Sequence, residues 1–160
     1  MADQKTNAMR ILDQKKIKYE VFSYPHEEGV CVEGSKVAEL LNQDSNLVFK
    51  TLVCISNTKR YYVCCIPVNK EIDLKKAAKA LNVKSLEMIH VKELLPLTGY
   101  VRGGCSPIGM KKSFVTIMND SALSYDYIYF SGGKIGLQIK MDPKDLSKVI
   151  NLTYSNIVSD

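Results

Sequence analysis

Apolar and polar residues alternate along several short segments of the chain, and two of these segments are neighbours in sequence. Residues 48–55 and 60–68 are rich in β-branched and aromatic side chains, and a polar stretch typical of a turn, 56–59, separates them. The pattern therefore predicts a β-hairpin. Further strands are predicted at 19–23, 86–89, 100–102, 114–118, 127–130 and 137–140.

Helical periodicity is confined to short segments between these strands. Helices are predicted over 6–16, from Gly34 onward, over 74–81, around 91–95 and from Asp142-Pro143 to about residue 150. Thr6 or Asn7, Asp73 and Asp142 are suitable N-caps for three of them. Strands and helices follow one another without regular β–α alternation. This order predicts an α+β fold, with a curved, barrel-like mixed sheet flanked by helices.

Length and composition favour a soluble globular protein. The chain has 160 residues, of which 46% are hydrophobic and 24% charged, so we expect one domain over residues 1–160. The first five residues are polar, which does not fit a signal peptide. The longest apolar run, 61–68, is far below the ~20 residues of a membrane helix. We therefore expect a cytoplasmic protein without a membrane segment.

The cysteines and the charge restrict the chemistry further. Five cysteines form no C-x-x-C pair and the two histidines, His26 and His90, are far apart, so neither a metal nor another cofactor is expected. The net charge of +5 suits an anionic partner. A lysine-rich solvated surface explains the same charge equally well.

Lys50 is unusual for its position in a predicted strand. Strand alternation places it on one face with Val48, Leu52 and Cys54, and the opposite face is also mostly apolar. A lysine in such a strand is costly unless it is paired or opens into a cleft. The alternative is a lysine at a strand end whose ammonium reaches solvent.

Two glycine-rich segments, 102–112 and 131–136, each join predicted strands. Exposed backbone N–H groups in such loops can receive a carbonyl oxygen, an oxyanion or a phosphate. Neither segment fits the P-loop or the G-x-G-x-x-G pattern, and a structural turn explains each of them equally well. Ser131 lies where a strand ends, a usual place for a site residue.

Recognisable catalytic motifs for hydrolysis are absent from the sequence. There is no G-x-S-x-G, no H-E-x-x-H and no pair of carboxylates in an apolar setting. Cys105 has no histidine linked to it by a motif, so we expect it to line or support its loop rather than to act as a nucleophile. The residues alone indicate an α+β domain in which a lysine and two glycine loops can share a cleft.

In combination, these segments resemble the YbaK family of aminoacyl-tRNA deacylases, in its Cys-tRNA(Pro) deacylase branch. The resemblance extends from about residue 6 to the last helix, and it rests on segments that occur in the family's order: Phe49-Lys50-Thr51-Leu52, Lys75-Lys76-Ala77-Ala78-Lys79, Thr98-Gly99-Tyr100, residues 103–112 and Ser131-Gly132-Gly133-Lys134. It implies a barrel-like sheet related to the editing domain of bacterial prolyl-tRNA synthetases. It also implies a substrate, cysteine mischarged on proline tRNA.

The resemblance assigns roles to particular residues. Lys50, Tyr24 and Ser131 become the catalytic residues: Lys50 holds the ester region or the terminal ribose-phosphate, and the other two line the pocket. Substrate-binding residues are expected in and beside the glycine loops: Gly103, Gly104, Ser106, Pro107, Gly109 and Lys134. Lys111 and Lys112 are expected to meet the acceptor stem together with Lys134. The family resemblance further implies that the substrate's own thiol attacks its ester, so that orientation and charge stabilisation are the protein's contribution.

Three other functions remain open on the sequence. A deacylase for alanine on proline tRNA would use an external water, and a non-catalytic module would bind tRNA without ester loss. A general binder of acidic partners would use only the positive surface. The expected partners are tRNA and, as a second candidate, prolyl-tRNA synthetase.

Overall fold

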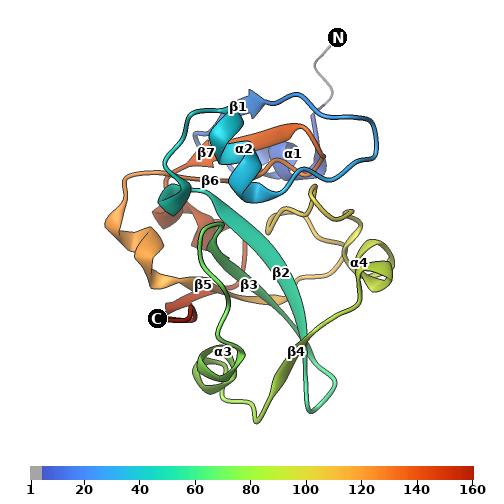
Figure 1. Ribbon diagram of the computed structural model, residues 1–160, viewed down its shortest axis with the longest axis vertical. Helices are drawn as coiled ribbons and strands as arrows, with labels where there is room; N and C mark the ends of the chain where they lie inside the picture. Colours follow the sequence, from blue (N-terminus) through green and yellow to red (C-terminus); the bar gives the residue numbers. More distant parts are fainter. Residues whose placement is uncertain (1–4) are drawn as a thin grey trace.

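The computed structural model describes residues 5–160 as two β-sheets with helices packed around them (Figure 1). Residues 1–4, on which most of the prediction about the polar N-terminus rests, lie outside the described part. Within residues 5–160, none of the helices has the length and apolar character needed to cross a membrane.

The larger sheet has five strands and contains the predicted hairpin. Its order is β4 (Leu86–Met88), β2 (Phe49–Ser56), β3 (Tyr61–Pro67), β5 (Val115–Asn119) and β8 (Leu152–Ser155). β2 pairs with β3 and β4 in antiparallel fashion, whereas β3–β5 and β5–β8 are parallel pairs. The mixed sheet predicted from the absence of β–α alternation is thus confirmed.

The smaller sheet is antiparallel and has three strands, in the order β1 (Glu20–Ser23), β7 (Leu137–Met141) and β6 (Ile128–Ser131). A single parallel bridge between Val48 and Tyr129 connects it to the start of β2. The predicted α+β class is confirmed, but the described strands form two sheets rather than a closed barrel. Among the described residues, this isolated bridge of one residue pair is the only pairing between the β2 region and the smaller sheet, so the two sheets do not close into one barrel.

In the part of the chain that the structure describes, four short α-helices and three 3-10 helices complete the fold. Polar side chains cap several of them as predicted: the Thr6 hydroxyl accepts a hydrogen bond from the Met9 N–H at 3.3 Å, and Asp73 accepts from the Lys75 N–H at 3.0 Å. The elements are α1 (Asn7–Gln14), α2 (Gly34–Leu40), α3 (Leu74–Ala80), α4 (Val91–Thr98), η1 (Ser45–Leu47), η2 (Asp120–Ser124) and η3 (Pro143–Lys148).

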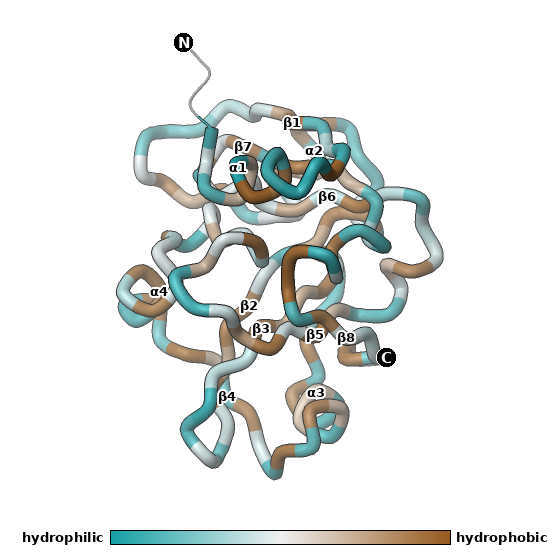
Figure 2. The backbone as a smooth tube through the Cα atoms, turned by 180° about the vertical axis from the view of Figure 1, so that it is seen from behind, coloured by the Kyte–Doolittle hydropathy of each residue, from teal (hydrophilic) through white to brown (hydrophobic). Residues whose placement is uncertain are grey.

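The β2–β3 hairpin is buried on both faces and forms the centre of the molecule. One face, with Phe49 and Val53, packs in a core with α1, β6 and β7, and the other, with Cys54, packs against Ala77 and Ala78 of α3. Figure 2 shows the apolar stretches of β3, β5 and β8 close together near the middle of the molecule. A site at the start of β2 is therefore built on the buried centre of the fold.

Three details of the sequence prediction are corrected. Residues 100–102 form a turn rather than a strand, because the Tyr100 N–H bonds to the Thr98 hydroxyl at 3.0 Å and the Gly104 N–H to the Val101 carbonyl at 2.9 Å. The last predicted helix is the 3-10 segment η3, with i to i+3 bonds. β8 was not predicted, since its parallel pairing with β5 depends on tertiary context.

Candidate functional site

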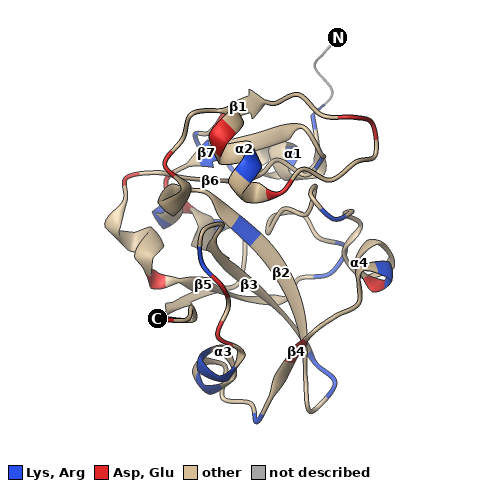
Figure 3. Ribbon diagram, viewed as in Figure 1, with Lys and Arg blue, Asp and Glu red and all other residues tan. Residues whose placement is uncertain are grey.

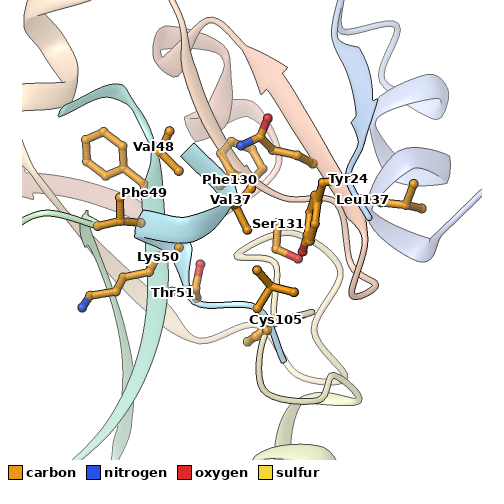
Figure 4. A pocket seen from close by; sticks show the side chains of 15 residues that line it. Tyr24, Val37, Val48, Phe49, Lys50, Thr51, Cys105, Phe130, Ser131 and Leu137 are labelled. Atoms are coloured by element: carbon orange, nitrogen blue, oxygen red, sulfur yellow. The ribbon is translucent and has the colours of Figure 1, made fainter. Parts of the chain in front are cut away.

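A cavity of about 110 Å³ lies where the start of β2 meets the end of β6 and the start of β7 (Figure 4). α2 and the segment before it contribute one wall, and the loop after residue 101 contributes another. Segments far apart in sequence thus converge on one small space. The lining residues are Tyr24, Val32, Gly34, Val37, Val48, Phe49, Lys50, Thr51, Val68, Gly103, Cys105, Phe130, Ser131, Leu137 and Gln138.

A pair of side-chain amides ties the α2 wall to the small sheet. Gln43, just after α2, donates to the Gln138 Oε1 at 2.7 Å, and Gln138 donates back to the Gln43 Oε1 at 2.9 Å. Gln138 is only 2% exposed, and the reciprocal pair satisfies its amide. The wall that carries Val37 is therefore fixed relative to β7.

Lys50 lies on β2 at the edge of this cavity and is half-buried. It is the only charged residue of its strand, where it forms a blue band in Figure 3. Within residues 5–160 its ammonium has neither an ion-pair nor a hydrogen-bond partner. In Figure 4 the side chain extends away from Tyr24 and Ser131. The ammonium is thus free to bind an anionic or carbonyl oxygen.

Three hydroxyl groups face the same space. Tyr24 follows β1 and is 7% exposed, and burial raises the pKa of its hydroxyl, with a smaller opposing effect from the Gly136 backbone. Ser131 ends β6, and its oxygen accepts a bond from the Gly133 N–H at 3.2 Å. The Thr51 hydroxyl lies 3.9 Å from the Cys65 sulfur. At neutral pH these groups are uncharged donors or acceptors.

Cys105 lines the cavity with a sulfur that is neither exposed nor ionised. The residue is 7% exposed, and burial raises the pKa of its thiol to about 12, although a hydrogen bond from Thr98 opposes the shift. A thiol with this pKa is protonated at neutral pH and is a weak nucleophile. The geometry therefore agrees with a wall-lining residue.

The two glycine loops pack directly against each other. A Cβ on Gly104 would come within 2.9 Å of the Ile135 backbone nitrogen and 3.1 Å of the Lys134 carbonyl carbon. A Cβ on Gly109 would meet the Tyr100 hydroxyl at 2.8 Å. These glycines allow close backbone approach, so the loops share one structural unit beside the cavity.

The structure brings together four of the residues predicted for the site and leaves five outside the lining. Lys50, Tyr24, Ser131 and Gly103 line the cavity. Gly104 and Gly109 support the loops, Pro107 is buried, and Lys134 is exposed away from the lining. Ser106 is 0% exposed, and its hydroxyl accepts a bond from the Ile108 N–H at 3.3 Å.

A larger hollow of about 320 Å³ adjoins the cavity. The two spaces share Val32, Gly34, Lys50, Thr51, Val68 and Gly103, and the hollow adds Cys31, Glu33, Ser35, Leu52 and Arg102. The shared residues form a common wall at the junction. The cavity and the hollow therefore lie side by side, with Lys50, Thr51 and Gly103 at their boundary.

The arrangement offers hydrogen-bond donors and one cation, and its cavity lining contains no carboxylate or imidazole. Such a site can orient a carbonyl and stabilise negative charge that develops on its oxygen. It lacks a group that could remove a proton from a nucleophile near neutral pH. Among residues 5–160, no cluster of three or more His, Cys, Asp or Glu side chains is arranged to hold a metal ion.

Several lining residues were not identified from the sequence. Thr51 had a signal, because it is a hydroxyl beside Lys50 in an apolar strand. Val32, Val37 and Leu137 had none, since apolar side chains that line a cavity have the same pattern as those of the core. Gln138 could be noticed only as an amide in an apolar strand.

Comparisons with known proteins agree with this geometry. The family model of the aminoacyl-tRNA editing domain matches residues 31–149. EbsC of Enterococcus faecalis, whose name proposes a Cys-tRNA(Pro)/Cys-tRNA(Cys) deacylase, is 43% identical over 156 residues, which cover 98% of this chain and 94% of EbsC.

Solved structures share the fold. One, described as a proposed trans-editing enzyme for prolyl-tRNA synthetase, has a TM-score of 0.81 at 19% identity and covers 99% of this chain and 100% of its own. Another, the hypothetical protein APE2540, has a TM-score of 0.85 at 18% identity, with 96% and 100% covered. The chain belongs to the aminoacyl-tRNA editing domain family, as the sequence resemblance indicated.

Proposed function

We propose that this protein is a trans-editing hydrolase that removes cysteine mischarged on proline tRNA. The observation that carries the proposal is the small cavity with one free lysine and neutral hydroxyls, joined to a larger hollow and lacking a general base. Family membership and the name of the Enterococcus faecalis relative support the same reaction. An editing step is useful because a synthetase discriminates near-isosteric side chains by only ~1–3 kcal/mol.

The two connected spaces fit the two parts of an aminoacyl-adenosine. The cavity of about 110 Å³ takes the aminoacyl group, and the hollow of about 320 Å³ takes the terminal adenosine. The ester then lies at the junction, beside Lys50, Thr51 and Gly103. In this arrangement Lys50 binds the ester or ribose oxygens, and Tyr24 and Ser131 position the aminoacyl group.

The nucleophile in this proposal belongs to the substrate. The cysteine thiol loses its proton to solvent, its sulfur attacks the ester carbonyl carbon, and the bond from that carbon to the ribose oxygen breaks. The ribose oxygen takes up a proton, and the released cyclic thioester is opened by water to free cysteine. The lining supports this route, because Cys105 is held protonated and the cavity assigned to the aminoacyl group contains no carboxylate or imidazole that could activate a water.

The cellular location and a candidate partner protein follow from the proposed substrate. Mischarged tRNA is present where translation takes place, so we infer that the protein acts in the cytoplasm. Prolyl-tRNA synthetase is a candidate partner, because it produces the mischarged tRNA and competes for the same acceptor end.

The direct test is a deacylation assay with purified protein and Cys-tRNA(Pro). We expect ester loss well above the spontaneous rate, with Pro-tRNA(Pro) left intact. Binding of Cys-tRNA(Pro) without faster ester loss would indicate the non-catalytic module instead. Preferential cleavage of Ala-tRNA(Pro) would indicate the alanine-specific enzyme and would overturn the substrate assignment.

A further inference from the structure

The hollow beside the catalytic cavity has a charged rim and apolar walls. Val32, Leu52 and Val68 contribute apolar surface, whereas Lys50 and Arg102 contribute positive charge. Its volume of about 320 Å³ lies within the ~300–1,000 Å³ of ordinary small-molecule sites. The combination suits a ligand that has a flat apolar part and an anionic part.

Arg102 is exposed at this rim, next to Gly103 at the junction of the two spaces. Within residues 5–160 its guanidinium makes no ion pair and no hydrogen bond with another side chain. The only carboxylate of the hollow, Glu33, is exposed and forms no ion pair with Arg102. Arg102 is therefore an unneutralised cation beside the space assigned to the adenosine.

We propose that Arg102 binds the phosphate on the 5′ side of the terminal adenosine of the tRNA. The inference rests on the proposed function, which places the ester at Lys50 and the adenosine in the hollow. The ribose bears the ester at one side and the 5′-phosphate at the other, so the phosphate leaves the hollow at its rim. A guanidinium binds phosphate with two parallel N–H···O bonds, which a lysine cannot reproduce. Arg102 is thus a substrate-positioning residue that recognises a nucleotide rather than an amino acid.

The test compares two small substrates that differ by one phosphate, cysteinyl-adenosine with and without a 5′-phosphate. We expect the wild-type protein to cleave the phosphorylated ester with a kcat/KM about tenfold higher, and Arg102→Gln to remove that preference. Cleavage of the unphosphorylated ester should stay within about twofold of wild type. Arg102→Lys should restore part of the preference, because it keeps the charge but not the paired donors.

Lys144→Gln is the matched control, since Lys144 is exposed, carries the same charge and lines neither space. It should leave the preference unchanged. The inference is wrong if the wild type shows no preference for the phosphate, or if Arg102→Gln lowers both rates equally.

Binding to uncharged tRNA(Pro) separates this inference from the proposed function. The slope of log affinity against log salt should fall by about 0.7 in Arg102→Gln, as for one lost phosphate contact on a single strand. If the wild type cleaves neither of these esters nor Cys-tRNA(Pro), the proposed function fails. The salt slopes still decide whether Arg102 contacts a phosphate, and equal slopes would overturn that contact.

Discussion

Lys50 shows how one side chain can carry a functional signal in an otherwise apolar strand. Phe49 and Val53 of the same strand are only 3% and 2% exposed, whereas Lys50 is half-buried. Lys50 lines both the cavity and the adjoining hollow. A position of this kind retains a cation only at the cost of some desolvation. In the proposed function, this cost is explained by the need for a cation that binds an oxygen of the substrate.

Lys50→Ala should lower kcat/KM for Cys-tRNA(Pro) at least tenfold, about 1.4 kcal/mol of transition-state stabilisation, while the protein remains folded. The physical reason is the loss of the only cation that lines the cavity. Single-turnover deacylation and circular dichroism measure the two effects. Lys144→Ala removes the same charge outside the site, and equal rates for Lys50→Ala and wild type would exclude Lys50 from the reaction.

Cys105→Ala should retain most of the activity, because the Cys105 thiol is protonated and lines a wall. The measurement is kcat between pH 7 and 9, where the rate should rise with ionisation of the substrate thiol, near pH 8.5 in a free cysteine. The mutant profile should have the same shape as that of the wild type. Loss of activity in a folded mutant would mean that the enzyme supplies the thiol.

At the scale of elements, the two glycine loops form one unit that holds the cavity in shape. The N-terminal end of α1 joins it, since the Thr6 side chain donates to the Gly132 carbonyl and the Asn7 side chain donates to the Gly109 carbonyl at 2.8 Å. The Tyr100 hydroxyl donates to the Ile108 carbonyl at 2.6 Å. Gly103 and Ser131 are thus positioned by contacts that lie outside the cavity.

Gly104→Ala should destabilise this unit, because the new Cβ would approach backbone atoms of the second loop at 2.9 and 3.1 Å. Overpacking of this kind costs ~1–3 kcal/mol, which urea denaturation would measure. Activity should also fall in the folded mutant, because separating the two loops displaces Gly103 and Ser131, which line the cavity. Gly29→Ala adds a Cβ in open space, so the strain of its φ of +75° is the only source of lost stability there, and activity should be unchanged. An unaltered midpoint for Gly104→Ala would mean that the loops can move apart freely.

The sequence predicted individual helices and strands better than it predicted how distant segments pair with one another. The hairpin and the caps Thr6 and Asp73 follow from local pattern, and so their prediction was confirmed. β8, the turn at 100–102 and the separation of the sheets depend on contacts between distant segments, which local pattern does not contain. The same applies to the candidate site. Lys50 could be predicted because it is a charged residue in an apolar strand, whereas the apolar lining residues have the same sequence pattern as core residues and could not.

At the scale of the whole molecule, buried thiols and phenols link stability to alkaline pH. Burial raises the pKa values of Cys65, Cys105, Tyr100 and Tyr154 to about 12, from 9.0 for a cysteine and 10.0 for a tyrosine. At a pH between the ordinary pKa of such a group and its raised pKa in the folded protein, the group is largely ionised in the unfolded chain but still protonated in the folded protein. Ionisation therefore favours unfolding, and stability must decrease as the pH rises.

We expect the contribution of these groups to the free energy of unfolding to be complete below about pH 9 and to be lost as the pH approaches 12. Urea midpoints at pH 8, 10 and 11.5, measured with a reductant, would follow the loss. Tyr154→Phe should lose less stability over this range than the wild type, because phenylalanine cannot ionise. A constant wild-type midpoint up to pH 12 would contradict the expectation.

In the proposed reaction, the protein removes cysteine from tRNA by means of the substrate's own thiol. The most direct measurement is the rate of ester loss from cysteinyl-, seryl- and alanyl-tRNA(Pro), side by side with the same protein. We predict rapid loss from cysteinyl-tRNA and almost none from the other two, because a hydroxyl is a much poorer nucleophile at neutral pH and a methyl group is none. Equal rates on cysteinyl- and seryl-tRNA would contradict it and would indicate an activated water.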